Sequence, residues 1–137
     1  MVAYNPWYDD MRIYALDRVE EVQATETRFK LPKGFDAKEY FADSFGIIVD
    51  ENYKVESVEV KVMGRQREYL RTLPLHHSQQ ETETAEDYSV FTFRLRPTFD
   101  FQQELRRYGA AAEVLSPQWL RDVFIKETEL LAAKYNR

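Results

Sequence analysis

The stretch Val90–Leu120 constrains the fold more than any other part of this chain. It predicts a strand, a helix, a second strand and a second helix, with very few residues connecting them. Apolar and polar residues alternate over Val90–Arg96, which is the pattern of a half-buried strand. Over Phe101–Tyr108 the apolar residues recur at helical spacing, and Gly109 follows where helices commonly end. The stretch therefore predicts strands and helices that are close neighbours in space.

The ends of the two helices are predicted from capping residues. Asp100 is the expected N-cap of the first helix, with Gln103 three residues later completing a capping box. Ser116 is the expected N-cap of the second helix, with Pro117 as its first helical residue. That last helix is expected to run to about Tyr135.

The residues before this stretch extend the pattern. Val55–Met63 alternates and predicts a strand, and Arg65–Arg71 predicts a short helix. Ser78–Thr84 has no apolar residue and fits a strand only at a sheet edge. The resulting order of strand, helix, strand, strand, helix, strand and an extra C-terminal helix is the split βαβ pattern of a ferredoxin-like α+β domain. Its open polar face would carry Glu59, Lys61, Thr92, Arg94 and Arg96.

The N-terminal residues predict a different small structure. Val2–Tyr4 and Met11–Ala15 should pair as a hairpin, and the second strand is expected to continue to Val19. On that strand Arg12, Tyr14 and Arg18 would share one face, where two guanidinium groups and an aromatic ring suit phosphates and a stacked base. The other interpretation is a solvated strand face with Arg18 paired to Asp17 or Glu20.

The remaining candidate residues favour structural roles. His76 and His77 are adjacent, so on an extended segment they should point in opposite directions and not share a metal ion. Arg94 and Arg96 could line the open sheet face, or could pair across strands with Glu59 or Glu81.

Several functional classes are disfavoured by composition and motifs. The chain has no cysteine, which removes disulfides and thiolate chemistry, and it has no phosphate-binding glycine motif. His77 and Ser78 lack the acid and the oxyanion loop of a catalytic triad. A net charge of −5 argues against a general duplex-DNA reader. No apolar run reaches the ~20 residues of a membrane helix. We expect a cytoplasmic protein that is not an enzyme and holds no metal or cofactor.

Three motifs occur in the order found in one bacterial family. They are RIYALDRV at Arg12–Val19, PLHHSQQE at Pro74–Glu81 and PTFDFQQELRRYGAAAEVLSPQWLRD at Pro97–Asp122. Together they resemble WYL-domain transcriptional regulators and the C-terminal extension of those proteins. The resemblance implies that residues 1–49 form part of a WYL domain, a small Sm-like or SH3-like β-barrel, and that residues 50–137 form the ferredoxin-like extension. The Trp-Tyr-Leu tripeptide of the family is absent, so we expect the chain to begin inside the WYL domain, without the helix-turn-helix domain.

The resemblance also implies a function. The chain would be the effector-sensing and dimerising region of a bacterial transcriptional regulator, a homodimer that binds a nucleic acid, including single strands, or a nucleotide. The expected ligand-binding residues are Arg12, Tyr14, Arg18, Arg94 and Arg96, and the expected structural or interface motif is His77, Ser78 and Gln79. One alternative is a pure protein-interaction module without a ligand. Another is a small acylphosphatase-like hydrolase, although the phosphate-binding loop of those enzymes is missing.

Overall fold

The computed structural model describes residues 1–136, which divide into two compact units. The first unit spans residues 1–36, and the second begins at Ala37. The predicted boundary between residues 49 and 50 separates the partial WYL domain from its C-terminal extension. It stays a prediction, because the division into compact units does not define the limits of family domains.

The first unit is built on an antiparallel hairpin of β1 (Val2–Asn5) and β2 (Asp10–Ile13), as the sequence predicted. The ladder runs from the Val2–Ile13 pair to the Asn5–Asp10 pair. The predicted continuation of the second strand to Val19 is wrong. Tyr14 exchanges backbone hydrogen bonds with Met1, and the chain then turns into the 3-10 helix η1 (Leu16–Arg18).

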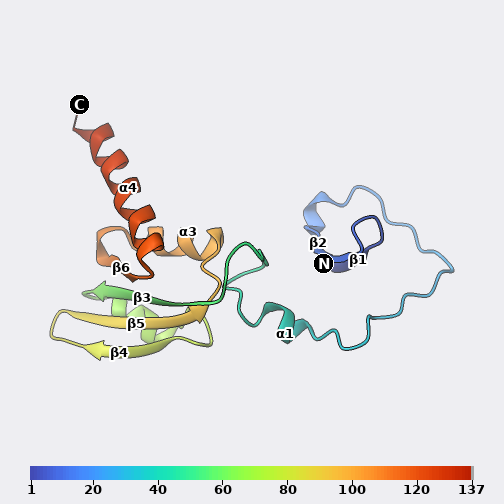
Figure 1. Cartoon of the computed structure of the whole chain (residues 1–137), viewed down its shortest axis with the longest axis horizontal. Coiled ribbons are helices and arrows are strands. Elements are labelled where there is room, and N and C mark those ends of the chain that lie inside the picture. Colours follow the sequence, from blue (N-terminus) through green and yellow to red (C-terminus); the bar gives the residue numbers. More distant parts are fainter. Residues whose placement is uncertain (137) are drawn as a thin grey trace. The chain divides into compact units, whose positions relative to one another are not determined.

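The second unit confirms the α+β class and contains a four-stranded antiparallel sheet in the order β4-β5-β3-β6. Its order of strands and helices follows the prediction (Figure 1). The polar strand β4 lies at a sheet edge, as expected from its lack of apolar residues. The elements are α1 (Ala37–Phe41), β3 (Glu56–Met63), α2 (Gln66–Thr72), β4 (Gln80–Thr84), β5 (Tyr88–Leu95), α3 (Phe99–Arg107), η2 (Gly109–Ala111), β6 (Ala112–Ser116) and α4 (Gln118–Tyr135).

The hydrophobic core lies between one face of this sheet and the helices. The alternating apolar residues of β3 and β5 belong to it, and α2, α3 and α4 contribute further apolar residues. Because strand side chains alternate, the polar residues of the same strands lie on the opposite, open face. The buried core residues are Val58, Val60, Val62, Leu70, Phe91, Phe93, Leu95, Phe101, Leu105, Val114 and Leu120.

The helix ends are partly as predicted. Gly109 follows Tyr108, the C-cap residue of α3, and has a positive φ of 53°, which confirms its role as a helix stop. The predicted capping box at Asp100 is wrong, because α3 begins at Phe99 with Thr98 in the cap position. The Asp100 carboxylate instead accepts hydrogen bonds from the Thr98 hydroxyl and from the backbone N–H of Phe101. Pro117 occupies the cap position of α4, one residue later than expected.

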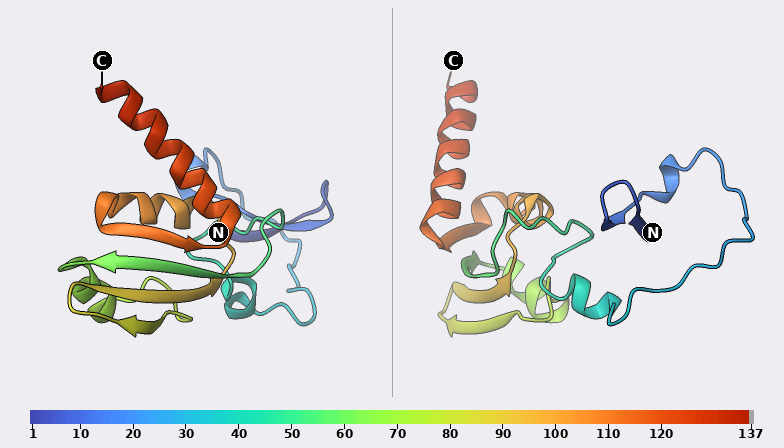
Figure 2. Two further views of the ribbon diagram at one scale, coloured as in Figure 1. Left: turned by 60° about the vertical axis from the view of Figure 1, so that its left-hand side comes forward. Right: turned by 45° about the vertical axis from the view of Figure 1, so that its right-hand side comes forward.

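The final helix α4 leaves the domain partway along its length. Leu120 is fully buried and Phe124 packs against the core, but every residue from Thr128 to Asn136 is exposed. The outer half of the helix accordingly projects beyond the rest of this unit (Figures 1 and 2). No helix within residues 1–136 combines the length and apolar character that crossing a membrane would require.

Candidate functional site

The tip of the N-terminal hairpin presents aromatic rings beside a guanidinium group. The Cζ atom of Arg12 lies 3.9 Å from the centre of the Tyr8 ring, which is a cation–π contact. Tyr8 is 63% exposed and its neighbour Trp7 is 89% exposed. Large aromatic side chains are seldom this free of contacts in a folded protein. The tip therefore offers flat apolar surface and a positive charge to the same ligand.

Short polar contacts shape this tip. The backbone N–H of Trp7 donates to the Asn5 side chain at 2.9 Å, and Asp9 takes a positive φ of 50°. The Tyr4 hydroxyl donates to the Asp9 carboxylate, and this hydrogen bond raises the pKa of Tyr4 above its ordinary value. Asn and Asp at these positions suit a tight turn, since their side chains bond the nearby backbone.

The expected alignment of Arg12, Tyr14 and Arg18 on one strand face is wrong. Arg12 lies on β2, but Tyr14 follows the strand and its hydroxyl accepts a hydrogen bond from the Asn5 amide at 2.5 Å. Arg18 lies in η1, beyond the end of the strand. No ion pair of Arg18 with Asp17 or Glu20 occurs in the part of the chain that the structure describes.

The open face of the four-stranded sheet carries a mixture of charges. The Lys61 ammonium lies 3.9 Å from the centre of the Tyr88 ring. The Tyr88 hydroxyl donates to Glu83 at 2.6 Å, and this bond raises the pKa of Tyr88. The pairing of β3 with β5 places Glu59 beside Thr92 on this face. Such a mixed face offers no continuous positive surface to a polyanion.

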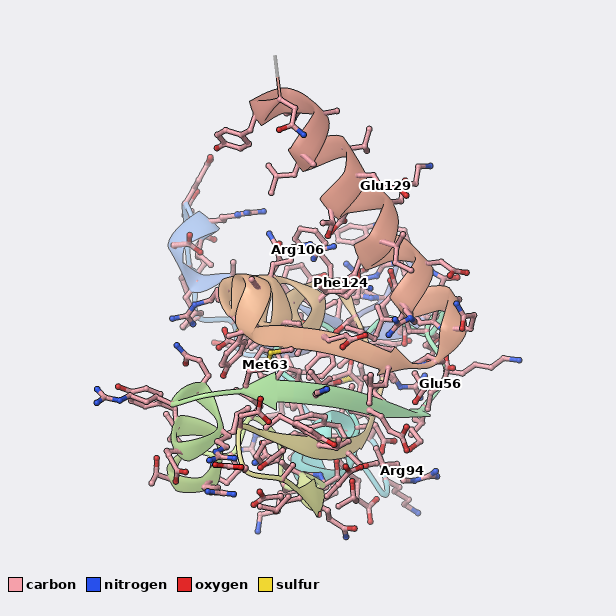
Figure 3. The ribbon with its side chains drawn as sticks, turned by 90° about the vertical axis from the view of Figure 1, so that its left-hand side faces the viewer. Glu56, Met63, Arg94, Arg106, Phe124 and Glu129 are labelled. Atoms are coloured by element: carbon pink, nitrogen blue, oxygen red, sulfur yellow. The ribbon has the colours of Figure 1, made fainter. Side chains whose placement is uncertain are left out.

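Arg94 and Arg96, the two arginines expected on this face, differ in their contacts. Arg94 is exposed and its side chain points away from the domain (Figure 3). The Arg96 guanidinium instead donates to the backbone carbonyl of Tyr53 at 2.7 Å. The alternative pairing with Glu81 is wrong, because that carboxylate binds Arg71. Pairing with Glu59 is likewise absent from the ion pairs among residues 1–136.

The two histidines lie side by side, contrary to the prediction that they point in opposite directions. Their ring centres are 4.1 Å apart with a tilt of 36°. The prediction failed because residues 76–79 form a turn and not an extended segment. The described residues contain no cluster of three or more His, Cys, Asp or Glu side chains that could hold a metal ion.

Ser78 and Gln79 join this turn to its neighbours. The Ser78 hydroxyl donates to the Arg94 carbonyl at 3.0 Å and accepts from the Arg94 N–H at 2.9 Å, which continues the sheet contact of β5 through a side chain. The Gln79 amide donates to the Leu70 carbonyl at 2.7 Å and accepts from the Leu75 N–H at 2.9 Å. Both side chains thus satisfy backbone groups near the core.

Two other arginines hold the domain together through contacts that the sequence did not predict. Arg67 donates to the carbonyls of Ala85 and Glu86, both at 2.8 Å, and so fixes the turn between β4 and β5. Arg106 binds the Glu127 carboxylate at 2.7 and 2.8 Å, joining α3 to α4. That contact lowers the pKa of Glu127. Both partners lie about 20 residues away, beyond the reach of any local pattern.

Apolar side chains follow one side of α4. A groove of about 330 Å³ runs between β6 and α4, and its apolar lining includes Val114, Phe124 and Ile125. Beyond it, Leu131 is 55% exposed and Tyr135 is 82% exposed. Apolar side chains that continue the inner stripe of a helix past its domain are typical of a contact surface.

A comparison with protein families gave a match within the second unit. The family model described as WCX domain matches residues 54–132, which is more than half of the chain and covers the sheet with its helices. A comparison with curated proteins gave no match. The matched residues include the edge strand, the His76–Gln79 turn and most of α4. The chain belongs to the WCX domain family, which is related to the WYL-type regulator domains.

Proposed function

We propose that this chain is the effector-sensing and dimerising region of a bacterial transcriptional regulator, acting in the cytoplasm and binding a nucleic acid or a nucleotide. Membership of the WCX family supports the regulatory role. The proposed ligand class rests on one observation. The Arg12 guanidinium stacks on the Tyr8 ring, and the ring of the neighbouring Trp7 is exposed. Sequence-specific duplex binding would belong to a separate domain of the regulator.

The hairpin tip suits a single strand better than a duplex. Bases of a single strand are free to stack on Trp7 and Tyr8, and such stacking contributes about 1–3 kcal/mol per base. The Arg12 guanidinium supplies a donor fork for an adjacent phosphate. A duplex reader would need a broad positive surface, whereas this chain has a net charge of −5.

A ligand at the tip regulates only if it binds one arrangement of the regulator better than another. Recognition, and not bond-making, is therefore the proposed chemistry. No step of this proposal needs a nucleophile, a metal ion or a cofactor.

The test is fluorescence anisotropy of a labelled single-stranded oligonucleotide of about ten nucleotides, titrated with the whole chain at low and physiological salt. We expect saturable binding that weakens with salt, and a loss of roughly 5- to 150-fold in affinity for Trp7→Ala, from the energy of one stacked base. Arg12→Ala should weaken binding and reduce its salt dependence. Arg94→Ala and Tyr69→Ala, an exposed arginine and an exposed aromatic of the other unit, are the matched controls.

The controls also distinguish the hairpin tip from the open sheet face. Binding that is unaffected by Trp7→Ala and Arg12→Ala but lost with Arg94→Ala would move the site to the open sheet face. A complete absence of binding would favour the module without a ligand. Hydrolysis of an acyl phosphate by the wild-type chain would support the alternative of an acylphosphatase-like hydrolase.

We also infer a homodimer, supported by the exposed apolar surface of α4. A two-fold axis near this helix would cover Leu131 and Tyr135 of both copies at once, because the same patch serves both sides of such an interface. Sedimentation equilibrium tests the inference. Leu131→Glu should raise the dimer dissociation constant, whereas Leu16→Glu, at a more exposed leucine of the first unit, should not. A wild-type chain that stays monomeric at high micromolar concentration would exclude the dimer.

A further inference from the structure

The two edges of the four-stranded sheet differ in their side chains. At one edge, β4 has only polar residues, and a bulge between Glu81 and Glu83 interrupts its pairing with β5. Polar residues and bulges both disfavour the addition of a further strand. At the other edge, β6 has the apolar residues Ala112, Val114 and Leu115, and it pairs with β3 in regular register from Ala112 to Val114. The outer edge of β6 is therefore the one whose composition suits another strand.

The hydrogen bonds of the sheet show which backbone groups face this outer edge. Arg94 exchanges backbone hydrogen bonds with the Ser78 side chain, which lies on the β4 side of β5. Backbone groups alternate in direction along a strand, so those of Phe91, three residues earlier, face β3 and pair with Val60. The N–H and C=O of Val60 are thus directed at β5. Val114 lies opposite Val60 on its other side, so it directs its own N–H and C=O to the outer edge.

One side chain of α4 covers these outward-facing groups. The Nη1 atom of Arg121 donates to the Val114 carbonyl at 2.7 Å and lies 2.9 Å from Oε1 of Glu113. The Arg121 and Glu113 side chains are 34% and 41% exposed, and an ion pair this open to water adds little to stability. The main consequence of the contact is at the strand edge, where it places a positive charge beside the backbone of β6.

A groove adjoins the same edge. It has a volume of about 330 Å³, and Phe124 and Ile125 of α4 line it opposite β6. The helix projects on the β6 side of the sheet, away from β4 (Figures 1 and 2). A strand added to β6 would have backbone groups of the sheet on one side and apolar side chains of α4 on the other. Strand-addition sites combine these two elements, main-chain hydrogen bonds and pockets for side chains.

The occupant that fits this edge is β6 of a second copy of the chain. Val114 presents one donor and one acceptor, so two antiparallel β6 strands related by a two-fold axis would exchange both bonds at this residue. That register places Glu113 opposite Leu115 of the second copy, so no like charges face each other across the pair. The edge is therefore complementary to itself once the Arg121 guanidinium is out of the way.

We propose that Arg121 blocks strand addition at the outer edge of β6 and so keeps two copies from joining their sheets there. The guanidinium occupies the Val114 carbonyl. An added strand would have to displace the guanidinium or bury its charge, and a buried charge without a partner is strongly unfavourable. The inference rests on the geometry of the sheet and does not depend on the proposed ligand or on the proposed contact through the exposed end of α4.

Hydrogen exchange of the Val114 amide, measured in the whole chain at low and at high micromolar concentration, tests the block. In Arg121→Ala we expect protection of this amide to rise at least about tenfold with concentration, since pairing would bury an N–H that faces the edge. In the wild type the amide should exchange at the same rate at both concentrations. Sedimentation velocity should show a matching gain in mass for the variant alone. Repeating both measurements with Leu131→Glu in each chain removes any contribution from the proposed α4 contact.

Three further variants test whether the charge at this position is the cause. Arg107→Ala removes another exposed helical arginine, which pairs with Glu104 away from β6, and should behave like the wild type. Arg121→Lys keeps a charge at the edge and should stay unassociated. Arg121→Ala/Ile125→Lys returns a positive charge to the groove one helical turn later and should reverse the association. Circular dichroism checks that each variant is folded.

Three results would overturn the proposal. The first is Val114 protection in Arg121→Ala that does not change with concentration. The second is association of that variant without protection of Val114, which would place the contact on another surface. The third is concentration-dependent protection of Val114 already in the wild type, which would show that Arg121 does not block the edge. If Arg121→Ala does not fold, Arg121→Met takes its place, because it keeps the apolar stem of the side chain and removes the charge.

Discussion

The guanidinium of Arg71 forms hydrogen bonds with both carboxylate oxygens of Glu81. Nη2 donates to Oε1 at 2.6 Å and Nε donates to Oε2 at 2.9 Å, a bidentate pair that joins α2 to the edge strand β4. Thr84 donates to the same carboxylate at 2.9 Å. Together these bonds hold the pKa of Glu81 down to about 2, with Arg71 as the largest cause. A strand that buries no side chain of its own is thus tied to the domain by charge.

Glu81→Gln should destabilise the domain at neutral pH and lose this effect in acid. The folded-state pKa of Glu81 lies below that of an unfolded glutamate, about 4.3, so its contribution is present above that value and is lost as the pH falls toward about 2. Thermal unfolding of both proteins at pH 7 and pH 2.5 measures it. The wild type should melt higher at pH 7, and the gap should be clearly smaller at pH 2.5, where part of the contribution remains because the folded-state pKa lies lower still. Glu51→Gln, at an exposed loop carboxylate, should show no gap at either pH.

Phe101→Ala should be among the most damaging single substitutions. The ring is fully buried and packs edge-on against both Phe45 and Phe93. Truncation of a buried phenylalanine costs about 3–5 kcal/mol in the free energy of unfolding. Urea titration followed by circular dichroism measures it. Phe99→Ala, two residues earlier on an exposed position of the same helix, should cost less than a third as much, and equal losses would contradict a core centred on Phe101.

Gly46→Ala should be destabilising although Gly46 needs no positive φ. A Cβ atom there would lie 2.5 Å from Oδ2 of Asp100, whose other oxygen is held by Thr98 and by the N–H of Phe101. Relief of such a clash typically costs about 1–3 kcal/mol. Asp100→Ala removes the obstructing oxygen, so the double variant should lose less stability than the two single losses added together. Additive losses in denaturant titrations would show that the two side chains do not meet.

Gln79→Glu should destabilise the turn that follows α2. The Gln79 amide donates to the Leu70 carbonyl and accepts from the Leu75 N–H, and a carboxylate keeps only the second contact. Leaving a partly buried carbonyl without its donor costs about 1–3 kcal/mol. The neighbouring Gln80→Glu, on the exposed edge strand, is the matched control in the same denaturant titration. A similar change for both variants would mean that net charge, and not the lost donor, is responsible.

The parts of the fold that follow a local period could be predicted from the sequence. Val58, Val60 and Val62 alternate with polar residues, and the structure buries all three, because a strand with one face on a core must alternate. Edge position was also predictable for β4, since a strand without apolar residues has no place inside a sheet. Gly109 was predictable because few other residues accept a left-handed backbone.

The parts that depend on distant partners could not be predicted. Arg67 looks like any exposed helical arginine until the turn carbonyls, about 20 residues later, come into place around it. The two histidines were placed on an extended segment, and nothing in their neighbours indicated the turn that stacks them. At the hairpin tip the local signal existed, because Trp7 and Tyr8 lie between Asn5 and Asp9 in a predicted turn.

The central position of β3 has a consequence for biosynthesis. This strand leaves the ribosome before both of its neighbours, since β5 begins 25 residues after Met63 and β6 comes later still. Until β6 emerges, the valines of β3 lack part of their cover, and the nascent chain displays a β-branched apolar strand with an open edge. Exposed strands of this kind favour association with other chains. The sheet is therefore complete only when nearly all of the domain has been made, and α4, the last element, closes the core through Leu120.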